Sequence, residues 1–185
     1  MNMNLSEPDL LHRAQKLNEQ ALAEIYDQFS PGIFRYAMRL LGDTVQAEDC
    51  VSETFSRFLQ ALHNGKGPKD HLKAYLYRIA HNWITDQYRR QPPPPLDIED
   101  YAATFADGSN IQQDVEKHLE QDRIRAALKM LPAAQRQVIV LRYLENWSIQ
   151  EVAANLKRSP GAVKAIQHRA TISLREFLTA QEKNK

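Results

Sequence analysis

A run of basic and amide side chains between residues 158 and 169 is the part of this sequence best suited to binding chemistry. Guanidinium, ammonium and amide groups bind phosphate oxygens and the base edges in the major groove of DNA. The residues that we expect to face outward are Arg158, Ser159, Gly161, Lys164, Gln167, His168 and Arg169. These residues favour contact with nucleic acid, although on their own they also fit the solvated face of a plain helix pair.

Two predicted helices would position this run. Ser148 followed by Glu151 is the pattern of a capping box that opens a short helix. Ser159 and Pro160 suit the N-cap and first position of a second helix. The expected inward residues are Ile149, Val152, Ala153 and Leu156 in the first helix, and Val163, Ile166, Ala170 and Leu174 in the second. Two helices joined by a short turn are typical of a helix-turn-helix, whose second helix enters the major groove.

A second mixed group lies on a helix predicted over residues 69–90. Aromatic rings stack on unpaired bases, and neighbouring cations follow the phosphates of a single strand. The residues concerned are Lys73, Tyr75, Arg78, Asn82, Trp83, Asp86, Arg89 and Arg90. The alternative is that Tyr75 and Trp83 belong to the core and that Asn82 is an ordinary surface amide.

Residue types that perform catalysis are present but are not arranged for it. The six histidines are scattered, and neither an HExxH pattern nor a serine-nucleophile signature occurs. Cys50 follows an aspartate, and acidic neighbours raise the pKa of a thiol, so it should be a poor nucleophile. A single cysteine also excludes an internal disulfide and a multi-cysteine metal site. We expect no enzymatic activity, no catalytic residue, no metal and no cofactor.

Apolar residues recur at helical spacing through the first half of the chain, and the periodicity predicts helices up to Leu41, over 43–62 and over 69–90. Ser30-Pro31 predicts a kink or a break in the first of these. Gly42 suits the left-handed position after a helix, and Asp43 with Gln46 predicts a capping box for the next.

Gln91 and the four prolines 92–95 must end the helix before them, because proline lacks an N–H and disfavours helix in the preceding residue. The acidic stretch that follows has little periodicity. We predict an all-α fold of two small helical domains joined by a flexible, acidic, Pro-rich linker, with a helix-turn-helix at the C-terminal end. The expected boundaries are 1–91, linker 92–113, and 114–185.

Charge is unevenly distributed along a chain whose net charge is only +1. Basic side chains dominate 66–91 and 157–185, whereas 92–122 carries eight carboxylates against one lysine. Such asymmetry favours a nucleic-acid partner. The longest aliphatic run, 138–141, is far short of a membrane span, and the first residues lack a signal-peptide pattern. We therefore expect a cytoplasmic protein without membrane insertion.

Three stretches in order resemble one family. The segment from Leu128 to Leu178, with LPAAQRQVIVLRYLENWSIQEVAANLKRSPGAVKAIQHRATISLREFL, resembles the C-terminal domain of extracytoplasmic-function (ECF) sigma factors of bacterial RNA polymerase. AEDCVSETFSRFL (47–59) and LKAYLYRIAHNWITDQYRR (72–90) resemble the N-terminal domain of that family.

The sequence departs from the family pattern at four positions. Asn146 and Lys157 stand where glycine is common, so both are expected in a left-handed conformation, at about 1–2 kcal/mol for Lys157. Tyr75 stands where the family usually has tryptophan, and His81 where it often has arginine. These departures bear on promoter preference rather than on the class.

The resemblance implies a sigma factor that binds core RNA polymerase and directs promoter-specific transcription initiation. It implies that helix 159–170 reads the −35 element of promoter DNA and that helix 72–90 captures the melted −10 strand, through the two residue sets given above. It also implies contacts with the β′ coiled coil and the β flap, and control by an anti-sigma factor. The residues implied for polymerase docking are Asp43, Glu48, Asp49, Val51, Glu53, Phe55 and Phe58, of which Phe55 could as well be core.

Two other classes of protein remain open on the sequence. A helix-turn-helix transcriptional regulator would act on duplex DNA without melting it, and would have little use for the aromatic and cationic residues of 72–90. A pure interaction module would bind the polymerase or an anti-sigma protein only. The acidic linker is equally compatible with a solvated tether and with a segment that enters the RNA exit channel.

Overall fold

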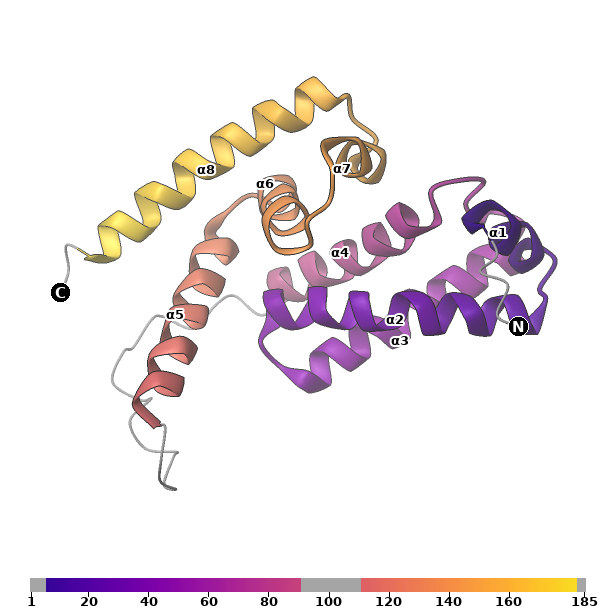
Figure 1. Ribbon diagram of the computed structural model, residues 1–185, viewed down its shortest axis with the longest axis horizontal. Coiled ribbons are helices and arrows are strands. Elements are labelled where there is room, and N and C mark those ends of the chain that lie inside the picture. The colour runs from indigo at the N-terminus through magenta and orange to yellow at the C-terminus, as the bar shows by residue number, and fades with distance from the viewer. Residues whose placement is uncertain (1–5, 91–110, 183–185) are drawn as a thin grey trace.

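The computed structural model describes residues 6–90 and 111–182, and over these ranges it is helical without a strand (Figure 1). The all-α prediction is confirmed. The helices of the first range are α1 (Glu7–Gln15), α2 (Glu19–Leu41), α3 (Thr44–His63) and α4 (Leu72–Arg90). Those of the second range are α5 (Ile111–Met130), α6 (Ala133–Ile139), the π-helical turn η2 (Val140–Leu144), α7 (Ile149–Leu156) and α8 (Pro160–Glu182). Of the linker predicted over 92–113, residues 92–110 lie outside the described residues, and 111–113 belong to α5.

Helix α2 runs without interruption through Pro31, so of the predicted kink or break the break is wrong. A proline inside a helix loses one backbone hydrogen bond and costs about 3 kcal/mol. Phe29 and Ile33, on either side of it, are buried in the core and hold the helix together across the lost bond. The helix ends as predicted at Gly42, which has a left-handed φ of 74°, and Asp43 then caps α3 by accepting from the Gln46 N–H.

Helix α1 lies within the range 1–91 that we expected to form the N-terminal domain. The sequence did not predict which elements it contacts. Its buried face packs against α2 and α3. The Glu7 carboxylate accepts a hydrogen bond of 2.9 Å from the backbone N–H of Leu72, the first residue of α4, and Gln15 donates one of 2.8 Å to the carbonyl of Pro68. An anion at a helix N-terminus is favourable because of the helix dipole. Helix α1 therefore fixes the start of α4.

The C-terminal domain has the predicted helix-turn-helix. The corner at Leu131-Pro132 separates α5 from α6, and Ser148 and Glu151 form the full capping box of α7. Asn146 and Lys157 have left-handed φ values of 55° and 52°, which confirms the expectation for both positions.

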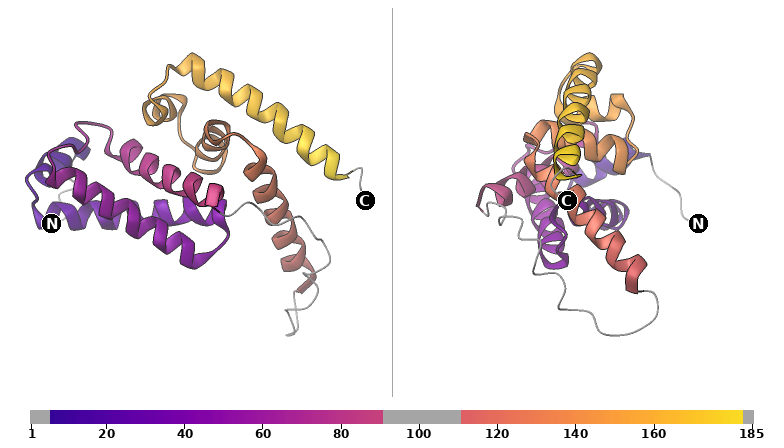
Figure 2. Two further views of the ribbon diagram at one scale, coloured as in Figure 1. Left: turned by 180° about the vertical axis from the view of Figure 1, so that it is seen from behind. Right: turned by 90° about the vertical axis from the view of Figure 1, so that its left-hand side faces the viewer.

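The two domains pack against each other and share one continuous core. Helix α7 lies on α4, and α5 contacts α2 (Figure 1). Helices α6 and α7 lie between α4 and α8, so α8 is on the outer side of the molecule in both views of Figure 2. The sequence offered no prediction about this packing, and it decides which candidate residues are accessible.

Candidate nucleic-acid interface

The N-terminal half of α8 has an exposed basic and polar face. Val163, Ile166 and Ala170 are buried on the opposite face, and they turn the other residues of this half outward. Ser159 caps the helix by accepting a 3.2 Å hydrogen bond from the Ala162 N–H. Six of the predicted residues are exposed: Arg158, Ser159, Gly161, Lys164, His168 and Arg169. A side chain at Gly161 would meet open space, so this end of α8 is free to approach a large partner.

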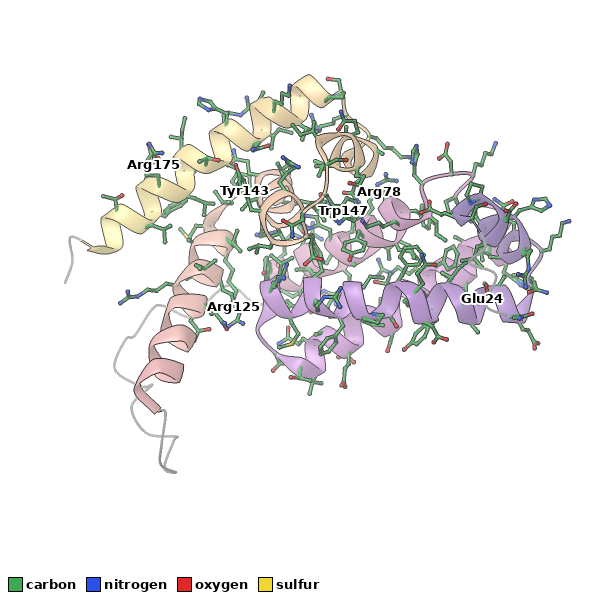
Figure 3. All side chains as sticks on the ribbon, in the orientation of Figure 1. Glu24, Arg78, Arg125, Tyr143, Trp147 and Arg175 are labelled. Atoms are coloured by element: carbon green, nitrogen blue, oxygen red, sulfur yellow. The ribbon has the colours of Figure 1, made fainter. Side chains whose placement is uncertain are left out.

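Gln167 is the one predicted residue of this set that is already engaged. Its amide Nε2 donates a 2.8 Å hydrogen bond to the hydroxyl of Tyr143, which is itself 55% exposed. Gln167 could contact a base only by giving up its hydrogen bond to Tyr143. Tyr143 therefore joins the candidate interface, a residue that sequence reasoning missed because it lies on η2, 24 positions before Gln167 (Figure 3).

The predicted residues on α4 divide into an exposed end and an engaged end. Asn82, Arg89 and Arg90 are exposed, and Asp86 pairs with Arg89 at 2.7 Å. Trp83 is half-buried against the core. Tyr75 is also half-buried and makes an edge contact with Phe58 at 6.3 Å between ring centroids, so part of its ring serves the core.

The two cations at the N-terminal end of α4 contact the C-terminal domain, although the Lys73 side chain remains 38% exposed. Arg78 donates to the carbonyl of Asn155 at 2.6 Å and to that of Ala154 at 2.9 Å, so it caps the C-terminus of α7. Lys73 lies 3.3 Å from the Glu151 carboxylate and 4.3 Å from the ring centroid of Trp147. In this arrangement neither cation is free to bind DNA.

Several residues that sequence reasoning missed hold this contact between domains. Asn155, which is fully buried, donates to the Ala74 carbonyl of α4 and accepts from Gln137, both at 2.7 Å. Trp147 is 2% exposed and packs edge-on against Tyr77 at 4.8 Å (Figure 3). Two features of the sequence could have indicated these residues. Trp147 is an apolar residue in the polar loop ENWS, and Asn155 is a polar residue on the otherwise apolar inner side of its helix.

A partly buried ion pair lies beside this contact. Arg39 of α2 binds the Glu145 carboxylate at 2.6 Å and also donates to the carbonyl of Leu144. Burial raises the pKa of Glu145, while Arg39 acts against that shift. The α2 helix is thereby tied to the loop that precedes α7.

The predicted docking set on α3 is only partly at the surface. Asp43, Glu48 and Asp49 are exposed. Glu53 is half-buried and pairs with Arg57 at 2.7 Å.

The apolar members of that set need a correction: Val51 and Phe55 are 6% and 7% exposed, and Phe58 is 1% exposed. They fill the core because their side of α3 packs against α2 and α4. Exposed apolar side chains on this part of the molecule include Val45 and Leu59 of α3 and Tyr26 of α2.

Cys50 is buried, and burial raises the pKa of its thiol to about 12. Burial, rather than its acidic neighbours, makes it a poor nucleophile. Among the side chains that the structure describes, those of 6–90 and 121–179, no group of three or more histidine, cysteine and carboxylate side chains could hold a metal ion. In the same ranges, no helix is both long and apolar enough to cross a membrane.

Comparison with known proteins gives two family matches. The model of Sigma-70 region 2 matches residues 25–92, and that of Sigma-70, region 4 matches residues 121–171. These ranges contain α4 and the helix-turn-helix, respectively.

Two curated relatives cover most of the chain. The ECF RNA polymerase sigma factor SigL of Mycobacterium tuberculosis is 33% identical over 158 residues, which are 85% of this chain and 88% of that protein. The ECF RNA polymerase sigma factor BldN of Streptomyces coelicolor is 28% identical over 174 residues and 92% of this chain, and the match spans 65% of the length of that relative.

Two solved structures are similar in fold. CnrH in complex with the cytosolic domain of CnrY aligns over 94% of this chain and 97% of that one, with a TM-score of 0.67 and 24% identity. The sigma factor RpoE of Bartonella quintana, in complex with the anti-sigma factor NepR, aligns over 85% and 96% of the two chains, with a TM-score of 0.53 and 25% identity.

Proposed function

The chain belongs to the ECF group of RNA polymerase sigma factors, and on that premise we propose that it binds core RNA polymerase and selects promoters by two separate contacts with DNA. A sigma factor is a transcription initiation factor and not an enzyme, so the chemistry of RNA synthesis belongs to the polymerase. We propose that the chain acts in the cytoplasm.

The first contact is α8 in the major groove of the −35 element. The observation that supports this contact is the N-terminal half of α8, the second helix of the helix-turn-helix. The side chains of Lys164, His168 and Arg169 are exposed there. The second helix of such a motif contacts bases with its N-terminal residues. Lys164 and Arg169 are the leading candidates for base or phosphate contacts, and Gln167 and His168 for base reading.

The second contact is α4 with the opened strand of the −10 element. Asn82, Arg89 and Arg90 are exposed for it, and the partly exposed rings of Tyr75 and Trp83 provide stacking surfaces. Stacking contributes about 1–3 kcal/mol per base, enough to offset the few kcal/mol needed to unstack and unpair one. Lys73 and Arg78 can join this site only when α7 leaves α4.

Polymerase docking is proposed for the outer side of α3. The carboxylates Asp43, Glu48 and Asp49 form an acidic rim, and the apolar part is supplied by exposed residues such as Val45. Acidic charge around an apolar patch suits a basic helical partner such as the β′ coiled coil. The β flap and an anti-sigma factor are the further partners that we propose, the latter supported by the likeness to the RpoE–NepR complex.

The test is run-off transcription by core polymerase, with and without the chain, from a library of random promoter fragments. We expect initiation that requires the chain, from fragments that share two spaced elements. Lys164→Ala should lower the yield by an amount equivalent to about 1–3 kcal/mol and relax the preference at one position if it reads a base. Arg175→Ala, an exposed arginine in the C-terminal half of the same helix, is the matched control (Figure 3).

One result would contradict this function, and another would change the role of a single residue. Transcription that does not depend on the chain, together with salt-sensitive binding of the free chain to duplex DNA, would identify a helix-turn-helix regulator. Uniform loss across all promoters on Lys164→Ala would reduce that residue to a phosphate contact.

A further inference from the structure

The contact between the two domains encloses a histidine that the proposed DNA contacts do not use. His81, on α4, is only 3% exposed. Its Nδ1 atom is 2.7 Å from the hydroxyl of Tyr36 on α2, and its Nε2 atom is buried without a hydrogen-bond partner. The side of the ring that has no partner faces Ala133 and Arg136 of α6, in the C-terminal domain.

This environment opposes a charge on the ring. Burial, followed by the charge of Arg136, lowers the pKa of His81 to about 3, while the backbone of Ala133 acts more weakly in the opposite direction. Arg136 is itself 4% exposed, and its guanidinium lies 4.3 Å from the ring centroid of Tyr88. A protonated imidazole would therefore be placed beside a fixed cation, and the backbone of Ala133 offsets that repulsion only in part.

The other titratable groups around this site do not change charge between pH 5 and 8. Burial is the main cause that raises the pKa of Tyr36 on α2, of Cys50 on α3, and of Tyr77 and Tyr88 on α4, so all four remain neutral. Burial lowers the pKa of Arg136 on α6, but an arginine stays charged in this range. His81 is thus the group of this site whose protonation can respond to mild acid.

We propose that His81 makes the packing of the two domains sensitive to pH, so that mild acid separates α6 and α7 from α4. The consequence for DNA rests on the proposed function: separation frees Lys73 and Arg78, which the packed arrangement holds against α7. The packed protein is then a closed form whose −10 site is partly covered by its own −35 domain.

The direction and size of the effect follow from proton linkage. When α6 leaves, the ring loses its buried surroundings and Arg136, and its pKa returns toward the ordinary value of about 6.5. The open form therefore binds more protons than the closed one, and packing is fully favoured above pH 6.5 and is lost as the pH falls toward 3. Between pH 7.5 and 5.5 the ratio of open to closed molecules should rise about tenfold.

The experiment measures the distance between the domains by fluorescence energy transfer in the full-length chain. Ser52→Cys on α3 and Thr171→Cys on α8 are exposed positions, and native Cys50 is buried and resists labelling. We expect the population with low transfer to grow about tenfold relative to the closed one from pH 7.5 to 5.5. The helical circular dichroism signal should stay constant, because only the domains separate.

His81→Gln keeps a neutral polar side chain beside Tyr36, and it should remove the pH dependence. His63→Gln, at an exposed histidine of α3, is the matched control and should leave that dependence unchanged. The same series in an Asn155→Ala background, which weakens the contact between domains, brings a small open population into the measurable range.

Equal pH dependence in the His81→Gln and unsubstituted proteins would overturn the proposal, as would transfer that stays constant with pH in both backgrounds. A loss of helical signal together with the loss of transfer would also overturn it, because acid would then unfold the protein. The distance measurement needs no polymerase. A failure in transcription would therefore refute the proposed function and leave the proton-coupled packing standing.

Discussion

Asn155→Ala should strongly weaken the contact between the two domains. The Asn155 side chain is fully buried and joins three helices: it lies on α7, donates to Ala74 of α4 and accepts from Gln137 of α6. Alanine removes both hydrogen bonds. It also leaves the buried Gln137 amide without its acceptor, and Gln137 is only 7% exposed.

The magnitude follows from these contacts. The two hydrogen bonds contribute a net 0.5–1.5 kcal/mol each, and an unpaired buried donor costs a further 1–3 kcal/mol, so the expected loss is about 2–6 kcal/mol. Gln137→Ala should cost less, because the Asn155 amide keeps its bond to Ala74. The double substitution should be less destabilising than the sum of the two by about 1 kcal/mol or more, since the residues share a bond.

The assay is equilibrium urea denaturation followed by tryptophan fluorescence. Trp147 is buried at the contact between domains, 4.8 Å from Tyr77, so its emission reports on that contact. Gln150→Ala, on the exposed side of α7, is the matched control and should change the free energy of unfolding by less than about 0.5 kcal/mol. The reasoning fails if Asn155→Ala stays within that same margin, or if the two substitutions are additive.

Three further substitutions test individual contacts by the same denaturation assay. Lys157→Gly should stabilise the protein by about 1 kcal/mol, because glycine relieves the left-handed strain at φ 52°. Asn146→Gly should change the free energy of unfolding less, since asparagine tolerates that conformation. Destabilisation by Lys157→Gly would contradict the presence of strain at this position. Glu7→Gln should lower the free energy of unfolding by about 0.5–1 kcal/mol, because it removes the charge at the N-terminus of α4. Glu176→Gln, at an exposed glutamate of α8, is the control and should have little effect. Equal effects of the two substitutions would argue against the capping role of Glu7. Arg78→Lys should cost about 1 kcal/mol because a single ammonium cannot reproduce the forked contact with two carbonyls, and an unchanged midpoint would refute that contact.

Features that depend on neighbouring residues were predictable from the sequence. The capping box of Ser148 and Glu151 joins residues three apart, and the left-handed Gly42 and Lys157 follow from helices that must end there. Such contacts form within one turn, so the residue types alone indicate them. The helix-turn-helix and the exposed face of α8 followed from the same local rules.

Predictions that depended on what packs against a helix were less secure. A break at Pro31 was wrong because burial of Phe29 and Ile33 outweighs the lost backbone bond. The periodicity of α3 showed that Val51, Phe55 and Phe58 share a side, but it could not show whether that side faces a partner protein or the core. Apolar residues satisfy either environment, and α2 and α4 decide in favour of the core.

The sequence by itself determined the class of protein through its resemblance to one family, and local periodicity, capping and charge predicted most of the helices and the exposed basic face of α8. Only the tertiary structure decided that α7 covers part of α4. The bonds from Arg78 to Asn155 and from Asn155 to Ala74 join residues 77 and 81 positions apart. No local pattern specifies such a pairing, because each of these polar groups would be satisfied equally well by water until the apolar surfaces around Trp147 and Tyr77 bring the two domains together.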